Sequence, residues 1–145
     1  MRSLIVIICA ALIAFAVRAE TLPGPINARV IRVLDGDTLE VTVKIWFDQE
    51  VTTRIRLTGV DTPEIKGKCQ QEITKALAAK KFTETIVPVN SHVTLYTLRP
   101  DKYAGRTDAG VALSNGADLA QALISNGFAR PYKGGARKSW CQEGQ

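Results

Sequence analysis

Three short polar segments of the 145-residue sequence combine charged side chains with turn-forming residues. The first contains Asp37, the second runs from Arg56 to Glu64, and the third contains Arg106. Carboxylates at separate turns can supply hard oxygen ligands to Ca²⁺ or Mg²⁺, provided that the fold brings Asp37 and Asp61 together. Guanidinium groups present permanently charged forks of donors to phosphate oxygens. A glutamate can accept a proton from water. These residue types together suit chemistry at a phosphate centre.

Each segment also has an ordinary structural interpretation when it is taken singly. Asp-Gly-Asp at residues 35–37 is a common turn sequence, because Asp side chains bond to nearby backbone groups. Asp-Thr-Pro-Glu at residues 61–64 is typical of a helix start. Arg54 lies two residues before Arg56, and we interpret it as a surface or supporting residue that could contact a substrate phosphate. The chemical interpretation therefore depends on whether the segments meet.

Hydrophobic periodicity predicts the elements that position these segments. Alternating or β-type composition predicts five short strands, at residues 28–34, 39–45, 51–58, 91–98 and 109–113. In the third strand Ile55 and Leu57 share one face, whereas Arg54 and Arg56 project from the other. Helix formers predict helices over residues 69–87 and 117–126. Five short strands with few helices indicate an α+β protein built on a small closed or partly open barrel.

The first 19 residues differ in composition from the rest of the chain. Arg2 precedes an unbroken apolar run of 14 residues from Leu4 to Val17. This run is shorter than the roughly 20 residues that span a bilayer. It predicts a secretory signal peptide that is cleaved after Ala19, with an uncleaved anchor as the alternative. Cys9 lies too early, within the apolar run, for a lipidation site. We therefore expect an exported protein, secreted or periplasmic, with no membrane attachment once processed.

The charge of the processed chain is only mildly basic. Cleavage removes Arg2 and Arg18 and no acidic residue, which leaves 17 Lys and Arg against 14 Asp and Glu, a net charge of +3. Basic residues gather in the last segment, residues 129–145, together with Tyr132 and Trp140. This composition fits either contact with nucleic acid or a solvated tail. The length excludes a two-domain enzyme with a bound dinucleotide.

Cleavage also leaves two cysteines, Cys69 and Cys141. In an exported chain such a pair suggests one disulfide, which would close a loop of about 70 residues and hold the basic segment down. Free thiols are the alternative. A zinc site is not indicated, since His92 is the only histidine.

The polar segments together resemble the staphylococcal-nuclease-like (thermonuclease) family, from about Arg29 to Tyr132. The strings that carry the resemblance are VLDGDT, RIRLTGVDTPE, DKYAGR and ADLAQALISNGFA, in the order of the family and close to its spacing. The resemblance implies a five-stranded OB-type barrel with about two to three packed helices. We accordingly expect an irregular lead-in at residues 20–27 and one nuclease-like domain over residues 28–145, including the basic segment.

The resemblance further implies calcium-dependent hydrolysis of DNA and RNA phosphodiesters. By motif position, Asp37 and Asp61 match the calcium carboxylates, and Thr62 matches the residue whose backbone carbonyl is a further ligand. The family's catalytic positions fall on Arg56, Glu64 and Arg106, and its nucleotide-contacting Lys and Tyr fall on Lys102 and Tyr103. We expect a monomer that acts with little sequence preference on single-stranded or flexible substrate.

The third motif departs from the family's common pattern. Ala104 is inserted between Tyr103 and Gly105, so Lys102 and Tyr103 are expected to be displaced relative to Arg106. Asp108 would be unfavourable beside a phosphate, and we expect it to face solvent.

Two other classes of function compete with the enzyme. One is a noncatalytic OB-type nucleic-acid-binding module, since such barrels often bind without cutting. The other is a calcium-stabilised secreted domain with another partner. The joint presence of the charged groups argues against the first of these; they are Asp37, Arg56, Asp61, Glu64 and Arg106.

Overall fold

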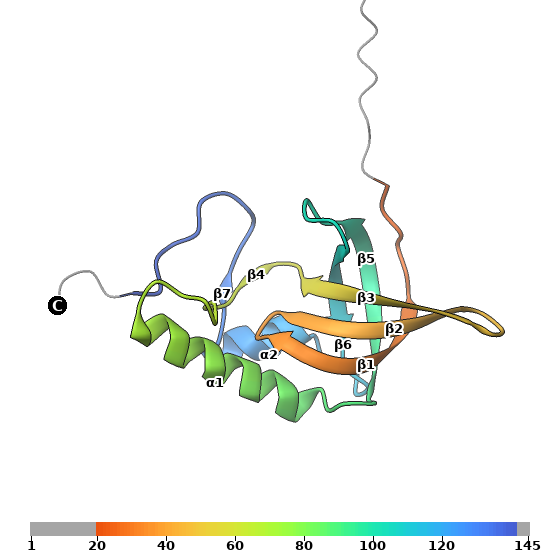
Figure 1. Ribbon diagram of the computed structural model, residues 1–145, viewed down its shortest axis with the longest axis horizontal. Helices are drawn as coiled ribbons and strands as arrows, with labels where there is room; N and C mark the ends of the chain where they lie inside the picture. The colour runs from red at the N-terminus through yellow and green to blue at the C-terminus, as the bar shows by residue number, and fades with distance from the viewer. Residues whose placement is uncertain (1–19, 142–145) are drawn as a thin grey trace, which may run out of the picture.

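The computed structural model describes residues 20–141, and its centre is a closed five-stranded barrel (Figure 1). The barrel strands are β1 (Ile26–Asp35), β2 (Thr38–Trp46), β3 (Gln49–Leu57), β5 (His92–Pro100) and β6 (Arg106–Ala112). Their order around the barrel is β1-β2-β3-β6-β5, with β3 and β6 parallel and all other neighbours antiparallel. The predicted five-stranded barrel is confirmed. The predicted signal peptide lies outside the described residues, so cleavage after Ala19 stays a prediction.

Within the described part of the chain, two helices accompany the barrel, in agreement with the two helices predicted from the sequence. They are α1 (Gln70–Ile86) and α2 (Leu119–Ser125), each within a few residues of its predicted bounds. Side chains cap both N-termini: Cys69 Sγ accepts from the Glu72 amide, and Asp118 accepts from the Gln121 amide at 2.8 Å. Neither helix, within residues 20–141, is long and apolar enough to cross a membrane.

A small second sheet was not predicted. It pairs β4 (Val60–Asp61) with β7 (Arg130–Pro131) in antiparallel register. Strands of two residues are too short to show an alternating pattern. The pairing nonetheless matters for the site, because it brings the start of the C-terminal segment, residues 130–141, beside Asp61.

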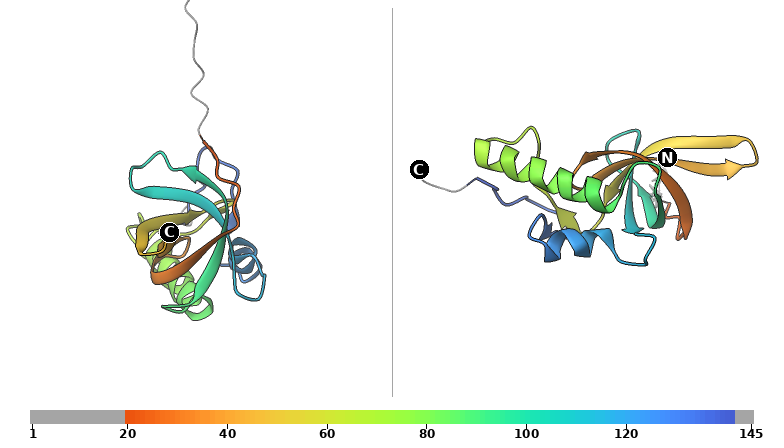
Figure 2. Two further views of the ribbon diagram at one scale, coloured as in Figure 1. Left: turned by 90° about the vertical axis from the view of Figure 1, so that its right-hand side faces the viewer. Right: turned by 90° about the horizontal axis from the view of Figure 1, so that it is seen from below.

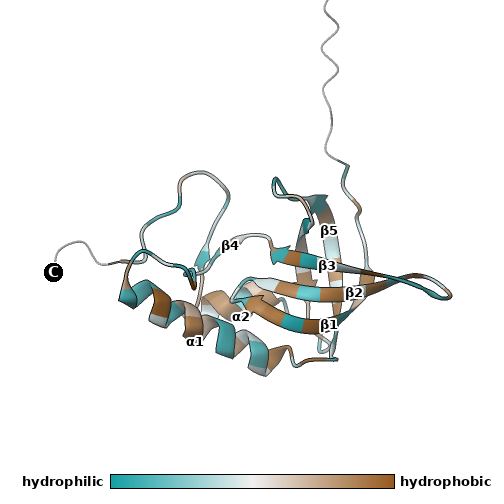
Figure 3. Cartoon of the chain, viewed as in Figure 1, coloured by the Kyte–Doolittle hydropathy of each residue, from teal (hydrophilic) through white to brown (hydrophobic). Residues whose placement is uncertain are grey.

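The core follows the alternation read from the sequence, which is visible along β1 and β3 in Figure 3. Ile55 and Leu57 are fully buried in the barrel, while Arg54 and Arg56, which alternate with them, point outward. At the helices, Phe82 of α1 stacks on Phe128 with ring centroids 4.6 Å apart. The fully buried side chains include Val30, Leu39, Val41, Leu95, Val111, Leu119 and Leu123.

Helix α1 packs closely on the turn between β1 and β2. A Cβ at Gly36 would lie 2.9 Å from the Ala79 Cβ, so this turn can approach the helix only because residue 36 has no side chain. Thr83 Oγ1 donates to the Gly36 carbonyl at 2.9 Å. The contact fixes the turn that carries Asp37.

The β2–β3 hairpin projects from the barrel, away from α1 and the C-terminal segment (Figures 1 and 2). Trp46 and Phe47 at its tip are 67% and 77% exposed, and their rings meet edge to face. Asp37, directly before β2, and Arg56, near the end of β3, both lie at the end of these strands that is opposite the tip. The chemistry-bearing residues therefore gather far from the hairpin tip.

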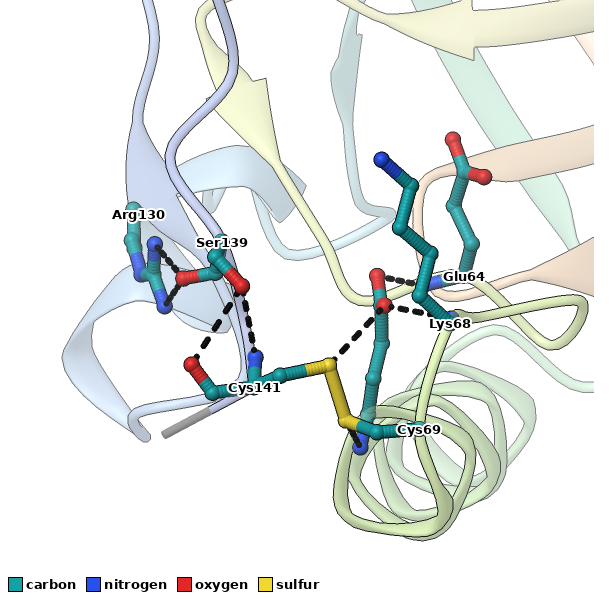
Figure 4. Close-up of a disulfide and its surroundings, with 7 residues drawn as sticks. Glu64, Lys68, Cys69, Arg130, Ser139 and Cys141 are labelled. Atoms are coloured by element: carbon teal, nitrogen blue, oxygen red, sulfur yellow. Dashed lines mark hydrogen bonds between the residues drawn. A yellow bond between two sulfur atoms is a disulfide. The ribbon is translucent and has the colours of Figure 1, made fainter. Parts of the chain in front are cut away.

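A disulfide joins Cys69 at the start of α1 to Cys141 at the end of the C-terminal segment (Figure 4). The predicted pairing is confirmed. The bridge lies beside the loop that carries Glu64, since the buried Glu72 carboxylate accepts from the Glu64 amide at 3.3 Å and the Lys68 amide at 3.0 Å. It thus anchors the C-terminal segment close to the polar end of the barrel.

Removing the bridge is expected to destabilise the protein substantially. The cysteines are 72 residues apart, and a loop of that size constrains the unfolded chain by about 4 kcal/mol in the chain-entropy account. We expect a Cys69→Ser, Cys141→Ser double variant to lose about that much free energy of unfolding in urea titrations. Ser at position 69 keeps an N-cap oxygen for α1. An unchanged urea midpoint would contradict this expectation. The native protein with its disulfide reduced is the matched comparison for the double variant.

Candidate active site

The three polar segments converge on one cavity of about 440 Å³ at the end of the barrel. Asp37 comes from the β1–β2 turn, Arg56 from the end of β3, and Arg106 from the start of β6. Thr62 and Glu64 follow β4 and line the same cavity. The structure therefore brings together groups that are far apart in the sequence.

Strand register explains this convergence. Arg56 is paired with Thr38 across β2 and β3, which places it beside the Asp37 turn. The parallel pairing of β3 with β6 sets Arg54 opposite Arg106 and Arg56 opposite Asp108. This pairing also extends β6 to Arg106, three residues before its predicted start. Tertiary hydrogen bonding thus makes a strand of a polar sequence that has no alternating pattern.

Asp37 is almost fully buried and lies beside Arg56. Arg56 Nη2 is 3.4 Å from Asp37 Oδ2, and Thr38 Oγ1 donates to Asp37 Oδ1 at 3.0 Å. Burial raises the pKa of Asp37, and the positive charge of Arg56 only partly opposes that shift. A further cation near Asp37 would favour its ionised form.

Arg106 is held by Asp101, whose side chain is only 4% exposed. Burial opposes the charge on Asp101, but the hydrogen bonds from Arg106 and the Tyr103 amide outweigh it and lower the pKa of Asp101. Arg106 is therefore fixed by an ionised partner while it faces the cavity.

The prediction that Asp108 faces solvent is wrong. Asp108 lines a second hollow of about 420 Å³, which shares Arg56, Glu64 and Arg106 with the first cavity. Its Oδ1 atom is buried and has no hydrogen-bond partner among the described residues. Burial raises the pKa of Asp108, and the negative charge of Asp101 raises it further. The register with β3 turns this side chain toward the hollow.

Lys102 and Tyr103 lie beside Arg106 despite the inserted Ala104. Both line the second hollow, and Tyr132 lines it too. Lys102 Nζ and the Arg106 guanidinium each lie 5.1 Å from the centroid of the Tyr103 ring. The structure thus brings this pair to the second hollow rather than to the first.

Arg54 takes no part in either cavity. Its Nε lies 3.8 Å from Glu40 Oε1, and Glu40 is also bound by Arg32 on the outer surface of the barrel. The neighbouring Arg56 is the arginine that the β3 strand delivers to the site.

The C-terminal segment covers Asp61, which sequence reasoning did not foresee. Arg137 donates from Nε to Asp61 and from Nη1 to Glu64, and its Nη2 donates to the Thr62 carbonyl at 2.7 Å. Trp140 Nε1 donates to the other Asp61 oxygen at 3.0 Å. The closeness of Cys141 to the basic segment in the sequence could have indicated this contact, because a disulfide to Cys69 places that segment beside the Glu64 loop.

The predicted metal ligands are hard oxygen atoms, which is the donor set that calcium prefers. Asp37 and Thr62 line the first cavity, and the carboxylate of Asp61 lies behind Arg137. The chemistry of these donors fits calcium. In the arrangement described, Asp61 and the Thr62 carbonyl are bound to a guanidinium.

Residues 54–143 match the protein family described as Staphylococcal nuclease homologue. The chain belongs to this family. A relative from Escherichia coli O157:H7, named "Uncharacterized endonuclease", is 33% identical over 125 residues, which cover 84% of this chain and 71% of the relative. The "Uncharacterized lipoprotein MG186" of Mycoplasma genitalium is 31% identical over 130 residues, and the match covers 83% of this chain and half of that protein. The staphylococcal nuclease resemblance read from the motifs is therefore confirmed.

In this nuclease-family site, replacing the Asp108 carboxylate is expected to stabilise the fold in a pH-dependent way. Because the folded-state pKa lies above the unfolded-state value, the ionised group destabilises the fold increasingly as pH rises through these two values. We expect Asp108→Asn to raise the urea midpoint at about pH 7 and to lose this advantage at about pH 3, where the acid is largely protonated in both states.

The exposed Asp48 of the hairpin tip supplies the matched control, Asp48→Asn. An increase of the urea midpoint by Asp108→Asn that is equal at both pH values would contradict burial of the ionised Asp108 carboxylate as the cause.

Proposed function

We propose that this protein is an exported, calcium-dependent nuclease that hydrolyses phosphodiester bonds of DNA and RNA with little sequence preference. The observation that carries the proposal is the single cavity where Arg56 and Arg106 face Glu64 and the oxygen atoms around Asp37. Family membership and the printed name of the Escherichia coli relative agree with it. In this proposal, the catalytic unit of the protein is the domain over residues 28–145.

The two arginines are proposed to bind the phosphate under attack. A phosphodiester is already an anion, and more charge develops on its phosphoryl oxygens as a nucleophile approaches. Arg56 and Arg106 are prepositioned by Asp37 and Asp101, so they need little reorganisation to receive that charge. A guanidinium can bond two oxygen atoms at once, which a lysine ammonium does less well.

Glu64 is proposed to accept a proton from the attacking water, or to orient that water. The new P–O bond forms as the bond to the leaving oxygen breaks, and the proton of the water passes to the carboxylate. Glu64 is suited to this role because it lines both hollows and its side chain is 58% exposed. Its backbone is held by the buried Glu72 carboxylate.

Asp37, Asp61 and the Thr62 carbonyl are the proposed calcium ligands. Bound calcium would polarise a phosphoryl oxygen and lower the cost of the charge that develops there. Lys102 and Tyr103 are proposed to contact the nucleotide from the second hollow, where an exposed aromatic ring can stack on a base. Stacking and phosphate contacts favour single-stranded or flexible substrate without selecting a sequence.

Export and the monomeric state are further parts of the proposal. A disulfide is typical of oxidising compartments, and the Mycoplasma genitalium relative is named a lipoprotein. The apolar run at residues 4–17 supplies the export signal. A secreted or periplasmic enzyme meets nucleic acid outside the cytoplasm.

Cleavage of labelled single-stranded DNA and RNA tests the enzyme directly. We expect cleavage in calcium that stops with a chelator, and we expect Glu64→Gln to lower kcat by about 100- to 10,000-fold while substrate binding persists. Glu84→Gln, at an exposed position of α1, is the matched control. Tight binding by the native protein without cleavage under any metal condition would instead support the noncatalytic binding module.

The arginine roles are tested by replacement with lysine. We expect Arg56→Lys and Arg106→Lys each to reduce kcat/KM by about 100- to 1,000-fold, since preorganised donors to a developing charge contribute effects of this size. Arg54→Lys changes a neighbouring arginine that faces Glu40 and should cut at the native rate. An equal loss of kcat/KM in all three variants would argue against specific roles of Arg56 and Arg106 at the phosphate.

A further inference from the structure

The C-terminal segment places a cationic side chain on two of the three proposed calcium ligands. Arg137 bonds the Asp61 carboxylate, the Thr62 carbonyl and the Glu64 carboxylate. We propose that Arg137 is an internal cation that competes with calcium for the Asp61 and Thr62 oxygen atoms and thereby sets the calcium concentration at which the site fills. This inference rests on the proposed calcium dependence of the enzyme.

The competition follows from the geometry of the donors. Arg137 Nη2 lies 2.7 Å from the Thr62 carbonyl oxygen, and Nε bonds Asp61, so the guanidinium lies directly against two proposed ligand groups. A divalent ion on the same atoms would meet a fixed positive charge at close range. Calcium and the guanidinium are therefore expected to oppose each other at Asp61 and Thr62 through charge repulsion.

The segment is anchored on both sides of Arg137. Before it, β7 pairs with β4, and the Tyr132 amide donates to the Gly59 carbonyl at 2.9 Å. After it, the disulfide fixes Cys141 to the start of α1 (Figure 4). A side chain tethered in this way has a high effective concentration at the site, so it competes better than a free cation would.

Trp140 strengthens the same contact. Its indole N–H bonds the second oxygen of Asp61 at 3.0 Å, and Arg130 stacks on its ring at 3.5 Å from the centroid. The Arg130 guanidinium in turn donates to the Ser139 carbonyl at 3.1 Å. Both oxygen atoms of Asp61 thus accept hydrogen bonds from one segment, so calcium that binds Asp61 is expected to weaken the contact with Arg137 and to change the surroundings of Trp140.

Measurement of calcium binding in the absence of nucleic acid tests the proposal. Isothermal titration calorimetry would compare the native protein with Arg137→Gln, and Trp140 fluorescence would follow the same titration. We expect Arg137→Gln to bind calcium about 10- to 100-fold more tightly, since hydrogen bonds to charged groups are of that strength. The native protein should also show a larger calcium-induced change of Trp140 emission than the variant.

Two further variants complete the design. Lys133→Gln removes the same charge from an exposed position of the same segment, and it should bind calcium with the native affinity. Arg137→Lys keeps the charge but loses the fork of donors, and its affinity should lie between those of the native protein and Arg137→Gln. Because Arg137→Lys retains a cation beside Asp61 and Glu64, its calcium affinity can be compared with that of the native protein if Arg137→Gln proves unstable without calcium.

The outcomes separate this proposal from the proposed function. Equal or weaker calcium binding by Arg137→Gln would overturn the competition while leaving the calcium-dependent nuclease intact. An equal gain for Lys133→Gln would also overturn it, since general charge would then explain the effect. Failure of every protein to bind calcium would overturn both the competition and the calcium dependence.

Discussion

The parallel pairing of β3 with β6 is the constraint on which the site depends. It closes the barrel, and in the same register it delivers Arg56 and Arg106 to one cavity. The remaining charged groups arrive from the β1–β2 turn, from the loop after β4 and, in Arg137, from the C-terminal segment. Opposite charges must then be matched at this end, because unpaired ions at partly buried positions are costly. Asp37 with Arg56 and Asp101 with Arg106 are the pairs that result.

The C-terminal segment extends this charge matching to the carboxylates of the β4 loop. Two of its basic residues make contacts within the fold, since Arg137 lies on Asp61 and Glu64 and Arg130 packs on Trp140, whereas Lys133 and Lys138 are exposed. The disulfide makes this arrangement local despite the length of chain between the two ends. Stability and electrostatics of the site are therefore coupled through one covalent bond.

The sequence predicted much of the fold for identifiable physical reasons. Alternation gave the core face of β3 because Ile55 and Leu57 must enter the barrel, and helix formers with caps placed α1 and α2. The motifs led to the cavity residues only through family resemblance, because spacing alone does not say which turns meet. Asp108 was misplaced, since its orientation depends on the register of a parallel strand pair. Arg137 was missed because a long-range ion pair leaves no periodic signal.

The alternation along β3 has a consequence for how such a protein can change over evolutionary time. Inward residues of this strand maintain the barrel, whereas the outward Arg56 contributes to the site and little to the core. Selection can therefore act on the two sets almost independently. If the proposed function holds, replacement of this one outward side chain would remove hydrolysis and leave the barrel folded. On that proposal, a descendant that binds without cutting would need one substitution on the outer face of β3 and no change to the interior.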